Sequence, residues 1–406
     1  MIVLYVKSGG YIMIGISRLL CDSENFGDSL RYAKGSHGQR DGAVSGHGPV
    51  VVWTSTKTCN LKCVHCYAAS ENKKYEGELS TTEAKAFIDD LADFKVPVLL
   101  FSGGEPLVRP DTFELAEYAV SKNIRVTYST NGLLIDKDVA KRMKQIGVGY
   151  VGISFDGIGS VHDEFRGMKG AFDKSLQAVK NCIEVGQKVG LRFTINQHNY
   201  RQLNEIFDFL EKEEIPRACF YHLVYSGRGN ELIKEDLTHE ESRHALDIIM
   251  DRTVDFHKRG IPKEILTVDN HADAIYLYLR AKEKYPERAE QIYELIKTNG
   301  GNRSGIAFGN VDNLGNVHPD QFTQNYNFGN VREQKFSQIW TKAEHEILHG
   351  LKDRKPLLKG RCSQCKWLNM CNGNFRARAD AIHGDFWESD PACYLTDEEI
   401  GLTEKA

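Results

Sequence analysis

Short apolar runs alternate with amphipathic stretches from about residue 50 to residue 225. The runs are rich in β-branched and aromatic residues and cover residues 50–54, 98–102, 125–129, 150–154, 190–195 and 218–223. The stretches between them have the spacing of helices, and the one over residues 80–94 opens with a capping box formed by Ser80 and Glu83. Strands that alternate with helices predict an α/β fold with a parallel sheet. Six such units favour a partial (β/α)6 TIM barrel over a closed barrel of eight units.

The pattern changes after Gly227. Residues 238–258, 271–282 and 288–297 are expected to be helical, with little sign of a strand between them. A hairpin is expected over residues 305–322, with its turn at 313–316. We therefore divide the chain into an N-terminal extension (1–46), the partial barrel (47–229), a helical insertion (230–302) and a small cysteine-rich C-terminal domain (303–406).

The composition is that of an ordinary globular protein. The chain has 406 residues, 41% of them hydrophobic, and a formal net charge of -4. This charge offers no general attraction to nucleic acid or to an anionic membrane. The apolar start of the chain is interrupted by Lys7 and by two glycines, so we expect a cytoplasmic protein without a membrane span. Met13 is a second candidate start, which would make residues 1–12 an added extension.

Seven of the ten cysteines fall into two groups with spacings typical of metal sites. The first group, Cys59, Cys63 and Cys66, follows the first predicted strand, at the end of a barrel where active sites gather. Three thiolates leave one iron of a four-iron cluster without a protein ligand, whereas zinc usually has C-x2-C pairs and a fourth ligand. This group therefore favours a [4Fe-4S] cluster over zinc or a chance grouping.

The second group supplies four thiolates, enough to complete a cluster by themselves. It consists of Cys362, Cys365, Cys371 and Cys393. Taken alone, this spacing leaves a structural zinc site as a serious alternative. The other cysteines, Cys21, Cys182 and Cys219, are expected to be small buried apolar residues.

The Cys59-x3-Cys63-x2-Cys66 motif resembles that of the radical S-adenosylmethionine (SAM) enzymes. Three loops that follow the next predicted strands strengthen the resemblance, namely Gly103-Gly104-Glu105-Pro106, Ser129-Thr130-Asn131-Gly132 and Ser154-Phe155-Asp156-Gly157. In that family SAM binds the open iron and is cleaved to a radical that abstracts hydrogen. The resemblance implies bound SAM and an electron donor such as ferredoxin or flavodoxin. The implied SAM contacts are Gly103, Gly104, Glu105, Ser129, Asn131, Ser154, Asp156 and Arg166.

Behind a barrel of this type, the C-terminal cysteines resemble the auxiliary-cluster domains called SPASM or twitch. The chain departs from the seven-cysteine SPASM pattern, because no cysteine lies between Cys219 and Cys362. The resemblance therefore implies one auxiliary [4Fe-4S] cluster on Cys362, Cys365, Cys371 and Cys393.

Over nearly its whole length the chain resembles the tetrapyrrole-modifying radical SAM enzymes of the siroheme-dependent heme pathway. The similar segments are residues 13–17, 220–229, 267–271, 315–322 and 371–375. The resemblance implies a tetrapyrrole substrate and the loss of two acetate side chains from 12,18-didecarboxysiroheme to give Fe-coproporphyrin III. Histidine and arginine suit an iron-bearing polycarboxylate, and we take His222, Arg228 and His271 as candidate substrate contacts.

Three other functions stay open at this point. A heme synthase that decarboxylates propionates, or a d1-heme enzyme, has the same motifs. A SPASM peptide maturase would need an N-terminal peptide-recognition domain, for which the residues before the first strand leave little room. A non-catalytic heme or iron-sulfur carrier would not need the loops that are expected to contact SAM.

Overall fold

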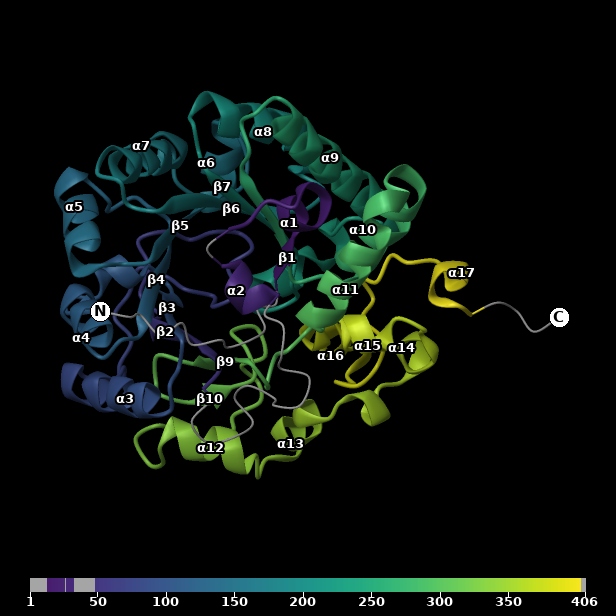
Figure 1. The fold of residues 1–406 in the computed structure, drawn as a ribbon. Helices are drawn as coiled ribbons and strands as arrows, with labels where there is room; N and C mark the ends of the chain where they lie inside the picture. Colours follow the sequence, from purple (N-terminus) through teal and green to yellow (C-terminus); the bar gives the residue numbers. More distant parts are fainter. Residues whose placement is uncertain (1–12, 26, 33–47, 403–406) are drawn as a thin grey trace, which may run out of the picture.

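The computed structural model describes residues 13–25, 27–32 and 48–402, so the prediction about residues 1–12 lies outside the described chain. The described strands form one sheet in the order β1-β8-β7-β6-β5-β4-β3-β2-β9-β10 (Figure 1). They are β1 Met13–Gly15, β2 Val50–Thr56, β3 Val98–Gly103, β4 Arg125–Thr130, β5 Tyr150–Phe155, β6 Val189–Ile195, β7 Arg217–His222, β8 Glu264–Val268, β9 Phe308–Val311 and β10 Val317–His318.

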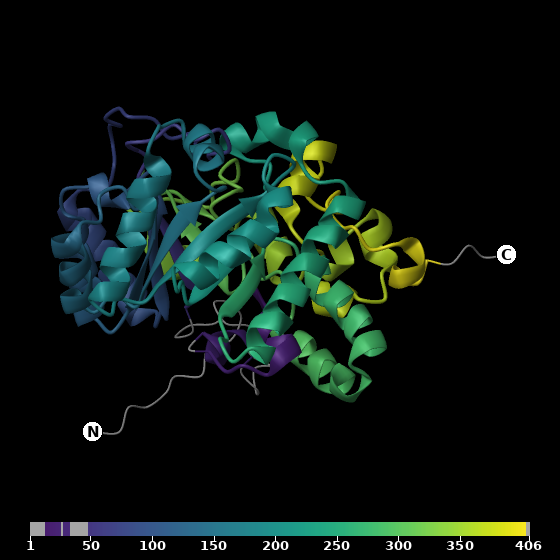
Figure 2. The same cartoon turned by 90° about the horizontal axis from the view of Figure 1, so that it is seen from above.

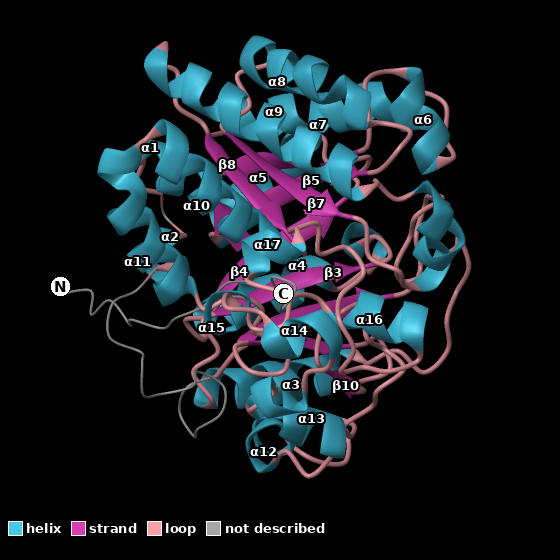
Figure 3. Cartoon of the chain, turned by 90° about the vertical axis from the view of Figure 1, so that its right-hand side faces the viewer, coloured by secondary structure: helices cyan, strands magenta, loops and turns pink. Residues whose placement is uncertain are grey.

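The six predicted strands are confirmed as β2 to β7, and each lies parallel to the next. Helices connect them and cover the outside of the curved sheet (Figures 1 and 3). The first of these helices has the predicted capping box, in which the Ser80 hydroxyl accepts from the Glu83 N–H and the Glu83 carboxylate accepts from the Ser80 N–H. The fold is therefore the expected α/β partial barrel.

The described helices vary from one turn to more than five turns. They are α1 Ile16–Cys21, α2 Asp28–Arg31, α3 Thr81–Asp93, α4 Thr112–Ser121, α5 Lys137–Ile146, α6 Ser160–Arg166, α7 Ala171–Glu184, α8 Leu203–Lys212, α9 His239–Lys258, α10 Ala272–Lys284, α11 Ala289–Asn299, α12 Phe336–Lys342, α13 Glu346–Lys352, α14 Gly360–Gln364, α15 Leu368–Cys371, α16 Arg376–His383 and α17 Asp397–Ile400. Among the described helices, none combines the length and the apolar character that a membrane crossing requires.

Side chains alternate between the outside and the inside of the barrel because the period of a strand is two residues. On β6, Leu191, Phe193 and Ile195 belong to the main apolar core under the helices. Each such side chain contributes roughly 1.5–3 kcal/mol when it is buried. Arg192 and Thr194, between them, line the interior of the barrel. The same alternation places polar residues from several strands inside the barrel.

The region 230–302 differs from the expectation of helices alone. It contains α9, α10 and α11 as predicted, but also β8, which extends the barrel sheet parallel to β7. β1, from the N-terminal extension, pairs with β8 in antiparallel fashion. A strand of only five residues, buried over four of them, shows too little alternation to be recognised in a sequence.

The predicted hairpin is present as β9 and β10, and β9 also pairs in parallel with β2. The C-terminal helices α14 to α17 lie on the side of the barrel opposite α3 and α4 (Figures 1 and 2). We placed domain boundaries after residues 46, 229 and 302, but strands from all four segments belong to one sheet. β1 pairs with β8, β7 with β8, and β2 with β9, so each boundary is crossed by strand pairing.

Candidate active site

The carboxyl ends of the barrel strands surround one cavity. The thiols of Cys59, Cys63 and Cys66 line it, as do many of the residues expected to contact SAM. These lining residues are Gly103, Gly104, Ser129, Asn131, Ser154 and Arg166. The three motifs that follow successive strands in the sequence therefore face the same space as the cysteine motif.

Each of the three thiols accepts a hydrogen bond. The Leu61 N–H donates to Sγ of Cys59 at 3.4 Å, and the Ser70 N–H donates to Sγ of Cys66 at the same distance. The Arg166 guanidinium donates to Sγ of Cys63 at 3.6 Å. Burial raises the pKa of the Cys59 thiol to about 12, so thiolates in this loop need positive charge beside them. Iron supplies that charge, and the donors offset part of the charge on sulfur, so this loop fits a cluster with three protein ligands.

Arg228, expected to contact substrate, donates hydrogen bonds to the cysteine loop. Its Nε donates to the carbonyl of Cys63 at 2.7 Å and its Nη1 to the carbonyl of Ser70 at 3.1 Å. It holds the two ends of the segment that includes Cys66. This contact was not apparent from the sequence, because Arg228 is far from the loop along the chain.

Glu105 lies behind the wall of the cavity. It is fully buried, and its carboxylate accepts from the N–H of Asn131 at 2.8 Å, the hydroxyl of Thr130 at 2.8 Å and the N–H of Leu107 at 3.0 Å. Burial raises the pKa of this carboxyl to about 7. In this structure Glu105 ties the loop after β3 to the loop after β4.

Asp156 lies beneath the wall as well, where it pairs with two cavity residues. Its carboxylate is 2.6 Å from Nη2 of Arg166 and 3.5 Å from Nε2 of His65. Because Arg166 also reaches the thiol of Cys63, Asp156 orients the guanidinium toward the cluster site. His65 also lines the cavity.

Of the other two candidate substrate contacts, only His222 lines this cavity. Its Nε2 is 3.0 Å from the carboxylate of Asp273, which also accepts from the hydroxyl of Tyr394 at 2.7 Å. Burial by itself lowers the pKa of His222, but Asp273 outweighs it and raises that pKa above the usual value. His271 is buried behind the wall, where burial lowers its pKa to about 4 and keeps the ring neutral.

Replacing Asp273 by asparagine is expected to destabilise the protein by about 2 kcal/mol at pH about 6, and by less as the pH rises. The folded pKa of His222 is raised, so the charge on its ring stabilises the fold below the unfolded pKa and this contribution is lost above the folded pKa. Anaerobic thermal unfolding at several pH values measures the difference in stability between Asp273→Asn and the unaltered protein. Asp208→Asn, at an exposed aspartate, serves as the control. A loss of stability in Asp273→Asn that stays constant with pH would contradict the prediction.

The second cysteine group lines a separate cavity between α14, α15 and the loop before α17. Cys362, Cys365, Cys371 and Cys393 all face it. The Trp367 N–H donates to Sγ of Cys365 at 3.4 Å, and burial raises the pKa of Cys393 to about 12. Within the described ranges, no three His, Cys, Asp or Glu side chains lie close enough together to bind a single metal ion. The four thiols surround a cavity instead, an arrangement that fits a cluster of several iron atoms.

The isolated cysteines are placed largely as expected. Cys182 and Cys219 are buried apolar residues, and Cys21 is partly exposed and packs against the main core. Neither cysteine cavity includes any of them among its lining residues in the described chain.

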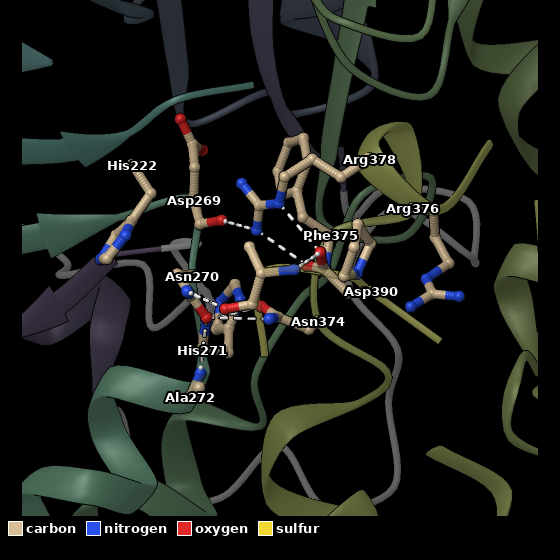
Figure 4. Close-up of polar contacts among 12 residues, drawn as sticks. His222, Asp269, Asn270, His271, Ala272, Asn374, Phe375, Arg376, Arg378 and Asp390 are labelled. Carbon is tan, nitrogen blue, oxygen red and sulfur yellow. Dashed lines mark hydrogen bonds and ion pairs between the residues drawn. The ribbon is translucent and has the colours of Figure 1, made fainter. Parts of the chain in front are cut away.

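A buried polar cluster connects the auxiliary-cluster region to the barrel (Figure 4). Arg378 and Asp390 form a fully buried ion pair, with Nη2 of Arg378 2.7 Å from the carboxylate. The same guanidinium donates to the carbonyls of Leu223 at 3.1 Å and Asp269 at 2.6 Å, both at the mouth of the barrel. Asn374 accepts from the backbone N–H of His271 at 2.7 Å. The segment between Cys371 and Cys393 therefore holds the backbone around the active-site cavity.

Comparison with known proteins agrees with this arrangement. The Radical SAM superfamily matches residues 53–210, and the SPASM iron-sulfur cluster-binding domain matches residues 307–366. The chain is 55% identical to Fe-coproporphyrin III synthase of Methanosarcina barkeri, over 97% of this chain and 100% of that protein. It is 43% identical to pre-heme d1 synthase of Dinoroseobacter shibae, over 87% of this chain and 88% of that protein.

Among solved structures, anSMEcpe with bound AdoMet has a TM-score of 0.66 to this chain at 19% identity, over 87% of this chain and 96% of that one. This likeness supports the fold. The radical SAM domain implies a [4Fe-4S] cluster and SAM, and the SPASM domain implies auxiliary iron-sulfur binding, which decides the choice between a cluster and zinc. The chain therefore belongs to the radical SAM superfamily, among its heme-pathway enzymes with a C-terminal SPASM domain.

Proposed function

We propose that this enzyme removes two acetate side chains from 12,18-didecarboxysiroheme and so forms Fe-coproporphyrin III. The observation that supports this most is the 55% identity to Fe-coproporphyrin III synthase over nearly the whole chain, against 43% to pre-heme d1 synthase. The proposed cluster count is one radical-generating cluster and one auxiliary cluster. We also propose ferredoxin or flavodoxin as electron donor and the cytoplasm as location, since a reducing compartment keeps cluster thiols free.

The proposed roles of the residues follow from their positions. Cys59, Cys63 and Cys66 would hold the cluster that, with SAM bound, supplies a hydrogen-abstracting radical. The next-to-last residues of β3, β4 and β5 are Ser102, Ser129 and Ser154, which line the same cavity, where hydroxyls suit the polar parts of SAM. Asp156 already holds the guanidinium of Arg166 in place. We propose that Arg166 also pairs with the carboxylate of SAM, which would then need no movement of the arginine side chain.

An anaerobic assay of the reconstituted, reduced enzyme with SAM and 12,18-didecarboxysiroheme tests the proposal. We expect 5′-deoxyadenosine together with a tetrapyrrole that has lost two acetate units by mass. Loss of carbon dioxide from propionates would instead indicate a heme synthase. Deoxyadenosine with an unchanged tetrapyrrole would reject the substrate, and absence of deoxyadenosine from protein loaded with clusters would favour a carrier.

A further inference from the structure

Four polar side chains that make no hydrogen bond to any described residue meet inside the barrel, below the cavity lined by the cysteine loop. They are Arg192 on β6, Tyr221 on β7, Asp269 directly after β8 and Gln321 after β10, and we call them the floor cluster. All four line both the active-site cavity and a second cavity deeper in the barrel. They therefore lie where the two cavities meet.

Arg192 is the cation of the floor cluster. Its guanidinium lies over the ring of Tyr221, with the carbon at its centre 4.4 Å from the ring centroid. Among the described residues its guanidinium has no hydrogen bond and no ion pair, although the carboxylate of Asp269 is near enough to interact with its charge. The neighbouring Arg217, in contrast, pairs with Glu264 at 3.4 Å. A buried guanidinium that makes no hydrogen bond to an anion is costly, so an anionic ligand that fits its donors would be bound strongly there.

The strand beside Arg192 is shaped to make room for it. Gly152 on β5 pairs with Gly190 on β6, two residues before Arg192. A side chain at position 152 would come within 2.7 Å of Cδ of Arg192, closer than atoms can approach. The glycine therefore allows the stem of Arg192 to lie across the inside of the sheet.

The other three members of the floor cluster are also unsatisfied. The hydroxyl of Tyr221, Oδ1 of Asp269 and Oε1 of Gln321 are buried without a hydrogen-bond partner among the described residues. Each such atom lowers the stability of the folded protein by about 1–3 kcal/mol unless a ligand or a water molecule forms a hydrogen bond with it. Several of them around one cation indicate a binding site rather than a packing defect.

Asp269 has an unusual backbone conformation that directs its side chain. Its φ of +68° is in the left-handed region, which costs energy for a residue other than glycine. Its carbonyl accepts from Arg378, while its carboxylate points away from the pair formed by Arg378 and Asp390 (Figure 4). Burial raises the pKa of Asp269 to about 7, so this side chain can hold a proton and donate it in a hydrogen bond.

We infer that the floor cluster is a subsite for a carboxylate side chain of the substrate, with Arg192 as its charge partner and Tyr221, Gln321 and Asp269 as hydrogen-bonding groups. This inference rests on the proposed tetrapyrrole substrate and deepens it. A carboxylate matches the planar guanidinium, takes hydrogen bonds from a phenol and from the amide nitrogen of Gln321, and accepts one from a protonated carboxyl. The buried Oε1 of Gln321 is an acceptor and takes no part in this match. The four groups reach the subsite from three barrel strands and from the SPASM segment, so substrate would be held by both domains.

Titration of the reconstituted enzyme with Fe-coproporphyrin III, followed by absorbance under anaerobic conditions, tests this. Arg192→Gln is expected to raise the dissociation constant about 10-fold to 100-fold, since a charge-assisted hydrogen bond is lost. Tyr221→Phe removes only a hydroxyl and should raise it about 3-fold to 10-fold, without lowering thermal stability. The tetramethyl ester of the same tetrapyrrole, which has no carboxylate, should bind alike to both variants and to the unaltered enzyme.

The controls separate this inference from the proposed function. Arg252→Gln, at an exposed pair with Asp208 on the outer helices, should bind the acid as the unaltered enzyme does. Iron and sulfide content and circular dichroism of Tyr221→Phe should equal those of the unaltered enzyme, which shows that the variant folds and holds its clusters. Unchanged affinity of both variants for the acid, or an equal loss of affinity for the ester, would overturn the subsite and leave the proposed function standing. An unaltered enzyme that neither binds nor converts a tetrapyrrole would overturn both.

Discussion

Replacement of Cys63 by alanine is expected to abolish the cleavage of SAM. Cys63 lies between the two other thiols of its loop, faces the active-site cavity and accepts from Arg166. Removing even an outer-shell partner of a metal ligand costs about 10-fold to 100-fold in activity, so loss of the ligand itself should cost more than about 100-fold. Quantification of 5′-deoxyadenosine, together with iron and sulfide content, measures the effect.

The auxiliary cysteines and a buried cysteine provide the controls for this variant. Cys63→Ala should retain the iron held by the C-terminal group, because that group lines a separate cavity. Cys182→Ala removes a fully buried thiol from α7 and should lower stability by about 1–2 kcal/mol while SAM cleavage continues. Cleavage by Cys63→Ala within about twofold of the unaltered enzyme would contradict the assignment of the cluster to this loop.

Replacement of Arg378 by methionine is expected to destabilise the protein by about 3–5 kcal/mol. The change leaves the carboxylate of Asp390 buried without its charge partner, and both side chains are fully buried in the native protein. It also removes the donors to the carbonyls of Leu223 and Asp269. Anaerobic unfolding in denaturant, followed by circular dichroism, measures the loss.

Two further variants show whether the ion pair is responsible. Arg259→Met, which breaks an exposed pair with Glu211, should cost less than about 1 kcal/mol because water screens that pair. Combining Arg378→Met with Asp390→Leu should cost less than the sum of the single changes, since neither charge is then left alone. Additive losses would show that Arg378 acts only through the two carbonyls.

The sequence by itself determined the features that depend on neighbours along the chain. The spacing of Cys59, Cys63 and Cys66 indicated a cluster with an open position, and the alternation of residues in each run predicted β2 to β7. The capping box at Ser80 was equally local, because its partner is three residues away. Such patterns are set by backbone periodicity and by the reach of a side chain, which a sequence records directly.

The tertiary structure alone decided the features that depend on contacts between distant segments. β1, β8 and β9 are short, and they join the barrel sheet because partners far along the chain bury them. The contact of Arg228 with the cysteine loop has a similar reason, since its hydrogen-bond acceptors lie 165 and 158 residues away. Arg192 and Asp269 were not identified in advance. An arginine in an apolar run at an inward position was the available signal, but its lack of a hydrogen-bond partner appears only when all its described neighbours are placed. Pairing across a sheet and the direction of a side chain in a barrel are set by long-range register, which local pattern does not encode.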